Sequence, residues 1–350
     1  MSRFLPVADP PLPLLITGIS GVAGFNALHY YRELYPGKVI GIRQRDNWRL
    51  TGPGVAECNA EDREGLRRLF AEHRFAAVLN CAGNCALKSC ELDPGMAWRI
   101  NVDGVQNLID VAQDFGARVV HLSIDLVFSG NGVGSHHESD PTDPVTVYGT
   151  TMVAAEELVL RQMPEAAILR ISLPMGISFN GHAGAIDWIQ SRFKKHKPAT
   201  LYFDEVRTPT YTDCLNPLYA AVLGRRLSGL YHAGAARRLS LYQIAQVINC
   251  VGGYDPALLI GCPRLEAGPI PPRAGDVSMN SARLSQTLGF DPFDPWPYDD
   301  ALVPSGIDWH FERPPHWPGS PRLLAELLYR NPRRRGNSIQ QYTTSRVVAS

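Results

Sequence analysis

The chain has 350 residues and a formal net charge of zero, with 45% hydrophobic and 19% charged residues. This composition predicts a globular protein with a substantial core, and the balanced charge gives no electrostatic reason to expect nucleic acid or an anionic membrane as a partner. No apolar run reaches the ~18 residues that a membrane-spanning helix needs.

The first predicted elements surround a glycine-rich turn. A short apolar strand at 14–16 runs into Gly18, Gly21 and Gly24, and a helical pattern continues to about residue 34. Such a strand, turn and helix favour a dinucleotide site: the first glycine permits the turn, the second admits a pyrophosphate, and the third lets the helix approach the strand. A tight turn without a ligand is the alternative at this point.

The second predicted strand, 38–42, ends in Arg43, Gln44 and Arg45, and the first acidic residue is Asp46. Sites selective for NAD place an acid here to bind the ribose 2′-hydroxyl, whereas guanidinium groups suit a 2′-phosphate. We therefore favour NADP(H) over NAD(H). The alternative is that both arginines are solvated surface residues.

Strands and helices then alternate along the chain with short connections. The pattern predicts helices at 59–73, 97–115 and 149–161 and strands at 76–80, 118–123 and 167–171. The small residues Cys81, Ala82 and Gly83 follow one of these strands, where backbone can approach a cofactor. This order predicts an α/β fold with a doubly wound parallel sheet covered by helices on both faces.

Ordered motifs extend this pattern over about residues 13–298. They lie at 17–24, 80–83, 101–102, 123–130, 138–149, 204–210 and 271–284. Together they resemble the extended short-chain dehydrogenase/reductases, and within these the dTDP-4-dehydrorhamnose reductase group. The resemblance implies a Rossmann core at 12–172 and a smaller C-terminal α/β substrate lobe at 173–300, interleaved with late core elements.

The resemblance also implies hydride transfer between a nicotinamide cofactor, which the arginines favour as NADP(H), and a 4-keto nucleotide-sugar. Tyr148 is then the expected proton donor, and Ser123 is the candidate catalytic hydroxyl. The candidate cofactor contacts lie in the predicted turns after the strands or at the starts of the predicted helices. They are Gly18, Ser20, Gly21, Val22, Gly24, Arg43, Arg45, Asn59, Cys81, Ala82, Gly83 and Tyr148.

The catalytic triad departs from the family pattern. Four residues after Tyr148, where the family has lysine, the chain has Met152, and the usual Ser/Thr position is Ile124. The neighbouring Ser123 would point the other way in a regular strand. Methionine is neutral and donates no hydrogen bond, so it cannot lower the pKa of the tyrosine. The nearby loops offer Lys88, His136 and His137 as replacement cations.

The resemblance to the reductases, together with the altered catalytic triad, leaves two candidate functions. The first is the nucleotide-sugar reductase with Tyr148 as proton donor. The second is a non-catalytic NADP(H)- or nucleotide-sugar-binding regulatory protein, for which the β subunit of methionine adenosyltransferase, itself similar to these reductases, is a precedent. Helices near 97–115 and 149–161 lie where such enzymes often pair, which suggests a homodimer as an alternative to a regulatory partner protein.

The remaining features concern cysteines and the chain ends. The seven cysteines have no zinc-type spacing, so we expect reduced thiols, no metal site and a cytoplasmic location.

Residues 1–11 are rich in proline and are predicted to be a loose leader. Residues 301–330, rich in proline and tryptophan, are expected to wrap the lobe, and 331–350 to form a basic disordered tail.

Overall fold

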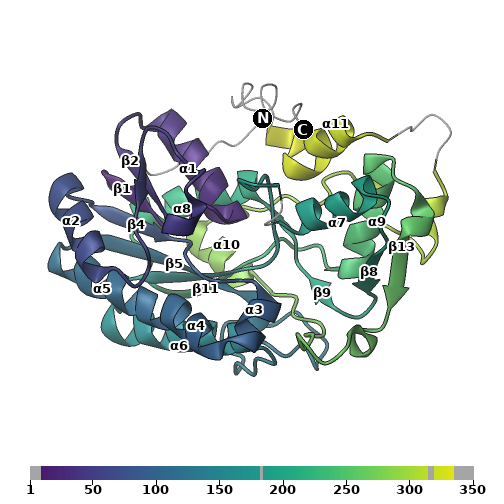
Figure 1. Ribbon diagram of the computed structural model, residues 1–350, viewed down its shortest axis with the longest axis horizontal. Helices are drawn as coiled ribbons and strands as arrows, with labels where there is room; N and C mark the ends of the chain where they lie inside the picture. The colour runs from purple at the N-terminus through teal and green to yellow at the C-terminus, as the bar shows by residue number, and fades with distance from the viewer. Residues whose placement is uncertain (1–8, 182–183, 314–318, 335–350) are drawn as a thin grey trace.

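The computed structural model describes residues 9–181, 184–313 and 319–334. Seven strands form its central sheet: β1 (Leu14–Ile16), β2 (Val39–Arg43), β3 (Val55–Glu57), β4 (Ala77–Asn80), β5 (Arg118–Ile124), β6 (Ala167–Ile171) and β11 (Gly229–Ala233). They are all parallel and lie in the order β11-β6-β5-β4-β1-β2-β3 (Figure 1). The order reverses at β1, and a crevice at such a switch point is where doubly wound sheets bind ligands.

Helices cover both faces of this sheet because successive strand residues point to opposite sides. Leu14 and Ile16 join the core cluster under α1 (Val22–Leu34), α8 (Thr212–Gly224) and α10 (Ala282–Leu288). Leu15 joins the opposite cluster, under α2 (Arg63–His73), α5 (Gly104–Asp114) and α6 (Val147–Gln162). The predicted Rossmann-type α/β fold is thereby confirmed.

One predicted helix differs from a regular one. The stretch at 97–115 consists of α4 (Pro94–Trp98), a wider π-helical turn at Arg99–Asp103, and α5; a short helix, α3 (Leu87–Leu92), precedes it. The wide turn contains the buried Asn101, whose side-chain oxygen accepts from the Asn84 backbone N–H at 2.7 Å and whose amide donates to Thr151 at 2.9 Å. The irregular turn therefore ties the loop after β4 to α6.

A second, smaller lobe has its own hydrophobic core, with buried members from Met175 to Leu328. Its helices are α7 (Ala185–Lys194) and α9 (Leu241–Gly252). Three short strand pairs accompany them: β8 (Ala199–Tyr202) with β13 (Leu259–Cys262), β9 (Val206–Arg207) with β12 (Leu239–Ser240), and β7 (Pro174–Met175) with β10 (Thr210–Tyr211). Figure 1 shows this lobe beside the carboxyl edge of the large sheet.

The C-terminal segment packs against both parts of the molecule. A short helix, α11 (Pro321–Leu324), continues into a wide turn at Ala325–Tyr329, and Leu324 and Leu328 are fully buried in the core of the lobe. Asn331 is buried, and Arg333 and Arg334 bind the Asp294 carboxylate. The prediction of a disordered tail is therefore wrong for 331–334, because a distant acid pairs with its arginines. Residues 335–350 and 1–8 lie outside the described part of the chain.

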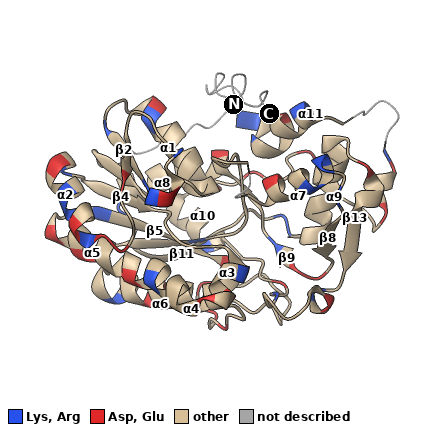
Figure 2. Ribbon diagram, viewed as in Figure 1, with Lys and Arg blue, Asp and Glu red and all other residues tan. Residues whose placement is uncertain are grey.

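Charged residues of both signs are interspersed over the described helices, as Figure 2 shows for α2, α5 and α6. No helix in the described ranges is long and apolar enough to cross a membrane. The described residues also contain no group of three or more His, Cys, Asp or Glu side chains placed to hold a metal ion.

Candidate functional site

The glycine-rich turn lies at the switch point of the sheet, between β1 and α1. Gly18 has a φ of +62°, and a Cβ there would lie 2.3 Å from the Cys81 carbonyl oxygen. A Cβ on Gly24 would lie 2.5 Å from the carbonyl oxygen of Gly18. Both positions therefore need glycine for reasons internal to the fold.

Gly21 differs, because the nearest atom to a Cβ there is the Gly18 carbonyl oxygen at 3.5 Å. Gly21 is the N-cap of the 13-residue helix α1. Because glycine has no side chain, it cannot accept a hydrogen bond from the first N–H groups of the helix. Ser20 and Val22 flank it. A glycine that no steric clash within the fold requires, placed beside helix N–H groups, fits the pyrophosphate of a dinucleotide.

The predicted contacts after β4 lie against this turn. Thr17 donates its hydroxyl to Asn80 Oδ1 at 2.5 Å and accepts from the Ala82 backbone N–H at 3.1 Å. Asn80 is buried and pairs with His121 Nδ1 at 2.9 Å, and burial lowers the pKa of His121 to about 4. This network places the Cys81 to Gly83 backbone beside Gly18, so the structure brings these candidate contacts together.

At the end of β2, both predicted phosphate-binding arginines are paired with a carboxylate that sequence reasoning did not single out. Glu57 lies 3.0 Å from Arg43 Nη1 and 3.0 Å from Arg45 Nε. Asn59, another candidate contact, accepts from the Arg45 backbone N–H at 2.8 Å. The pairing of Glu57 with Arg43 could have been found only from the strand register, because the two residues are directly opposite each other on β2 and β3.

Tyr148 lies in the first turn of α6, which Thr146 caps by accepting from the Gly149 N–H at 3.0 Å. Its side chain is only 8% exposed and packs among apolar residues that include Met152 and Phe128. Burial raises the pKa of Tyr148 well above its usual range; the Cys85 thiol and the Asp125 carboxylate raise it further, and Arg207 opposes them.

The other triad positions do not support the tyrosine. Met152 is 3% exposed and belongs to the same apolar cluster. The Ser123 hydroxyl donates to the Glu156 carboxylate, which is also held by Arg170 at 2.7 Å. Ser123 is thus engaged in a buried ionic network behind the strand and does not join Tyr148 as the predicted catalytic hydroxyl would.

Arg207, which sequence reasoning overlooked, is the positive charge that opposes the rise in the pKa of Tyr148 among the described residues. It is buried, and its guanidinium lies 2.5 Å from an Asp125 oxygen and 3.0 Å from a Glu205 oxygen. Burial opposes its charge, but these two carboxylates raise the pKa of Arg207 above its usual value. Arg273 adds a further contact to Glu205 at 2.8 Å, which makes the four-residue cluster electrically neutral.

The replacement cations considered from the sequence are placed differently. Lys88 is exposed on α3. His136 stacks on Phe128 with ring centroids 4.0 Å apart, and its Nδ1 lies 3.6 Å from the Asp140 carboxylate. His137 is exposed in the same loop. None of the three is among the charges that shift the pKa of Tyr148.

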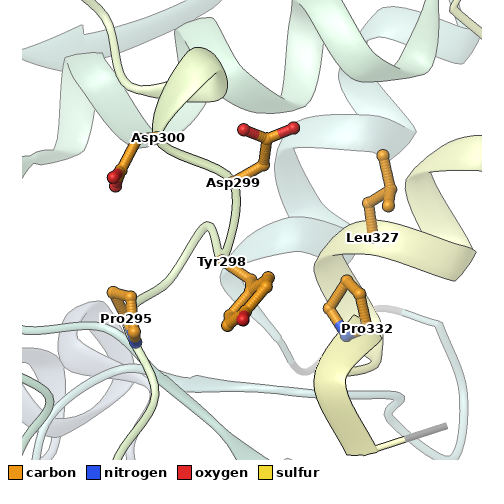
Figure 3. A pocket seen from close by; sticks show the side chains of 6 residues that line it. All are labelled: Pro295, Tyr298, Asp299, Asp300, Leu327 and Pro332. Atoms are coloured by element: carbon orange, nitrogen blue, oxygen red, sulfur yellow. The ribbon is translucent and has the colours of Figure 1, made fainter.

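Two cavities in the described structure lie away from the glycine turn. One, of about 550 Å³, is bounded by the segment 295–300 and by Leu327 and Pro332 of the C-terminal segment (Figure 3). The other, of about 520 Å³, lies at the lobe and is lined by Arg264 and Arg273 among others. Only the second is lined by a residue of the ionic cluster around Arg207, namely Arg273.

Comparisons with known proteins agree with this arrangement. A family model described as the RmlD substrate binding domain matches residues 34–300. The chain is 32% identical over 252 residues to a dTDP-4-dehydrorhamnose reductase of Streptomyces griseus, covering 69% of this chain and 77% of that protein. It is 24% identical over 324 residues to methionine adenosyltransferase 2 subunit beta of Danio rerio, covering 89% and 94%.

Among solved structures, the fold matches a Bacillus anthracis dTDP-4-dehydrorhamnose reductase in complex with NADP, with a TM-score of 0.68, 20% identity, and coverage of 81% of this chain and 95% of that chain. The motifs, the sheet order and the matched span together show that the chain belongs to the RmlD family, the dTDP-4-dehydrorhamnose reductase-like branch of the extended short-chain dehydrogenase/reductases.

Proposed function

We propose that the chain is an NADP(H)- and nucleotide-sugar-binding protein in which hydride transfer is slow or absent. The observation that carries the proposal is the environment of Tyr148. Its helix places Met152 where the family has lysine, and the cation that acts on it, Arg207, is paired with two carboxylates.

The missing lysine matters because a proton donor must hold negative charge after it gives up its proton. A cation about 4 Å from the phenolate would stabilise it by ~4 kcal/mol at an effective dielectric of 20, equivalent to a shift of ~3 pK units. In this chain the pKa of Tyr148 is instead raised, first by burial. A barrier higher by that energy corresponds to a rate lower by ~10³-fold.

The binding half of the proposal rests on separate residues. The backbone at Gly21 and the first turn of α1 would hold the cofactor pyrophosphate, and the 81–83 backbone would lie along the adjoining part. When bound, the cofactor would supply the hydride. These positions are independent of the triad, so binding and turnover can be separated experimentally.

The second candidate is a working reductase of a 4-keto nucleotide-sugar, with Tyr148 as proton donor. It is favoured by the position of Tyr148 at the start of α6, where no hydrogen bond to its hydroxyl occurs among the described residues. Relatives named as reductases support it. The Danio rerio subunit-beta relative, which matches a longer part of the chain than these reductases do, instead supports a partner-binding protein.

The test is NADPH binding by fluorescence, followed by NADPH oxidation with dTDP-4-dehydrorhamnose. We expect the wild-type chain to bind NADPH but to oxidise it slowly or not at all. Tyr148→Phe is the control that removes the candidate proton donor. Introducing both lost groups, in Met152→Lys with Ile124→Thr, should raise the rate by ~10²–10³-fold. Met152→Leu, which keeps the volume and adds no charge, is the matched control.

Wild-type turnover that disappears in Tyr148→Phe and is not raised by Met152→Lys with Ile124→Thr would establish the working reductase instead. If neither NADPH nor NADH binds, both candidates lose their common basis. Thermal unfolding of each variant separates these results from a failure to fold, because a lysine at the buried position of Met152 is expected to lower stability.

A further inference from the structure

Glu57 forms a bridge between the two arginines at the end of β2. Its Oε2 lies 3.0 Å from Arg43 Nη1 and its Oε1 lies 3.0 Å from Arg45 Nε. The bridge follows from the sheet, since Arg43 and Glu57 are opposite each other in the parallel register of β2 and β3. It occupies the place where a dinucleotide-binding fold recognises the 2′ substituent of the adenosine ribose.

The two arginines differ in how much of their hydrogen-bonding capacity remains. Arg43 donates from Nε to the Leu50 carbonyl at 2.9 Å and from Nη1 to the carbonyls of Gln44 and Arg45 at 3.1 and 3.2 Å. Its side chain is 11% exposed, so it mainly holds its own turn together. The side chain of Arg45 is 70% exposed, and among the described residues its guanidinium contacts only Glu57, at 3.0 Å. Arg45 is thus the guanidinium available to a phosphate.

The carboxylate changes the charge that a ligand meets. Two arginines alone would present +2, whereas with an ionised Glu57 the group carries +1. The hydrogen bond from Arg45, and then that from Arg43, lower the pKa of Glu57, so it is ionised at neutral pH. A 2′-phosphate has to compete with Glu57 for Arg45 and is repelled by it, whereas a 2′-hydroxyl can donate a hydrogen bond to a carboxylate.

We propose that Glu57 sets the cofactor selectivity of this site, by occupying Arg45 and so reducing the preference for NADP(H) over NAD(H) that the two arginines would otherwise produce. This inference rests on the proposed function as a cofactor-binding protein and specifies how that site discriminates. The wild-type chain then binds NADPH and NADH with similar affinity, and Glu57 and Arg45 are its specificity-determining residues.

The experiment compares dissociation constants for NADPH and NADH, measured by fluorescence titration at low salt. In Glu57→Gln, which keeps the shape and removes the charge, NADPH should bind ~3–10-fold more tightly, as expected for partly exposed charges, while NADH binds no more tightly than in wild type. The gain should shrink in 0.5 M salt because the charges are solvent-accessible. In Arg45→Gln, which leaves the Glu57 carboxylate without that cation, NADPH should bind more weakly than in wild type while NADH is little changed.

Glu33→Gln is the matched control, since Glu33 is an exposed carboxylate near the far end of α1. It removes the same charge and should leave the ratio of the two constants unchanged. The inference is overturned if Glu57→Gln alters that ratio less than twofold, or tightens both cofactors equally, while wild type binds normally. Loss of binding of both cofactors to wild type would instead overturn the proposed function, and the inference with it.

Discussion

At the scale of single residues, the three glycines of the turn have different physical roles. Gly18 and Gly24 are required by close approach of backbone, since a Cβ on either would meet a carbonyl oxygen at 2.5 Å or less. A Cβ on Gly21 would fit without a clash, since its nearest neighbour would be the Gly18 carbonyl oxygen at 3.5 Å. One motif thus contains two residues that serve the fold and one that leaves room for a ligand.

Because of this difference, we expect one alanine substitution to lower stability and another to weaken cofactor binding. Gly18→Ala should lower the free energy of unfolding by at least ~2 kcal/mol, because it combines a left-handed backbone conformation with a steric clash. Gly21→Ala should unfold like wild type but weaken NADPH binding at least tenfold. Urea denaturation and fluorescence titration measure the two effects. Unchanged NADPH affinity in Gly21→Ala would contradict the assignment of the site.

At the scale of elements, β5, β6 and α6 are joined by a buried ionic network. Arg170 on β6 forms two contacts with Glu156 on α6, at 2.7 and 2.8 Å, and Ser123 on β5 donates to the same carboxylate. This network explains why the serine next to the expected catalytic position is unavailable to Tyr148. It also fixes the helix that presents Tyr148 at the edge of the sheet.

We predict that Glu156→Gln costs ~3–5 kcal/mol of stability, because it leaves the Arg170 charge buried without its partner. Replacing both residues, in Glu156→Leu with Arg170→Met, should cost less than the single change, since no unpaired charge remains. Urea denaturation of both variants gives the comparison. If the double variant is less stable than Glu156→Gln, the ion pair stabilises the fold beyond the neutralisation of the two buried charges.

At the scale of the whole molecule, the C-terminal segment joins the two parts of the structure. The Asn331 backbone N–H donates to Asp213 of α8 at 2.9 Å, and the Tyr329 hydroxyl donates to Asp187 of α7. Asp294 is the centre of this contact: its carboxylate accepts from Asn331 at 2.8 Å and from Arg334 at 3.1 Å. The family model matches residues 34–300, so this segment lies outside the matched residues.

Asp294→Asn should weaken the attachment of the C-terminal segment. Burial opposes its ionisation, but hydrogen bonds from Asn331 and the two arginines lower the pKa of Asp294. A carboxyl with a lowered folded pKa stabilises the protein above its unfolded pKa of 3.8, and this contribution is lost as the pH falls through the folded value.

We expect Asp294→Asn to cost ~1–3 kcal/mol at neutral pH and to make peptides covering 319–334 exchange amide hydrogens faster. Asp300→Asn, at an exposed carboxylate of the neighbouring turn, is the control and should leave this exchange as in wild type. Unaltered exchange in Asp294→Asn would contradict the role of this carboxylate.

The sequence by itself determined the features that depend on local chemistry. Alternating apolar runs predicted the parallel sheet, and the spacing of Gly18 to Gly24 predicted the turn. The resemblance to the reductase family located the triad positions, and the identities of Met152 and Ile124 there predicted an incomplete triad. Periodicity and residue type need no knowledge of distant parts of the chain, so these predictions required no structure.

Only the tertiary structure decided which charges meet. Glu57 lies opposite Arg43 because of strand register, Arg207 finds Asp125 from 82 positions along the chain, and Asp294 holds the arginines of a segment expected to be disordered. Each pairing neutralises a cation that the sequence presents as free. The energy of a charge depends on neighbours brought together by folding, and composition and spacing carry no information about those neighbours.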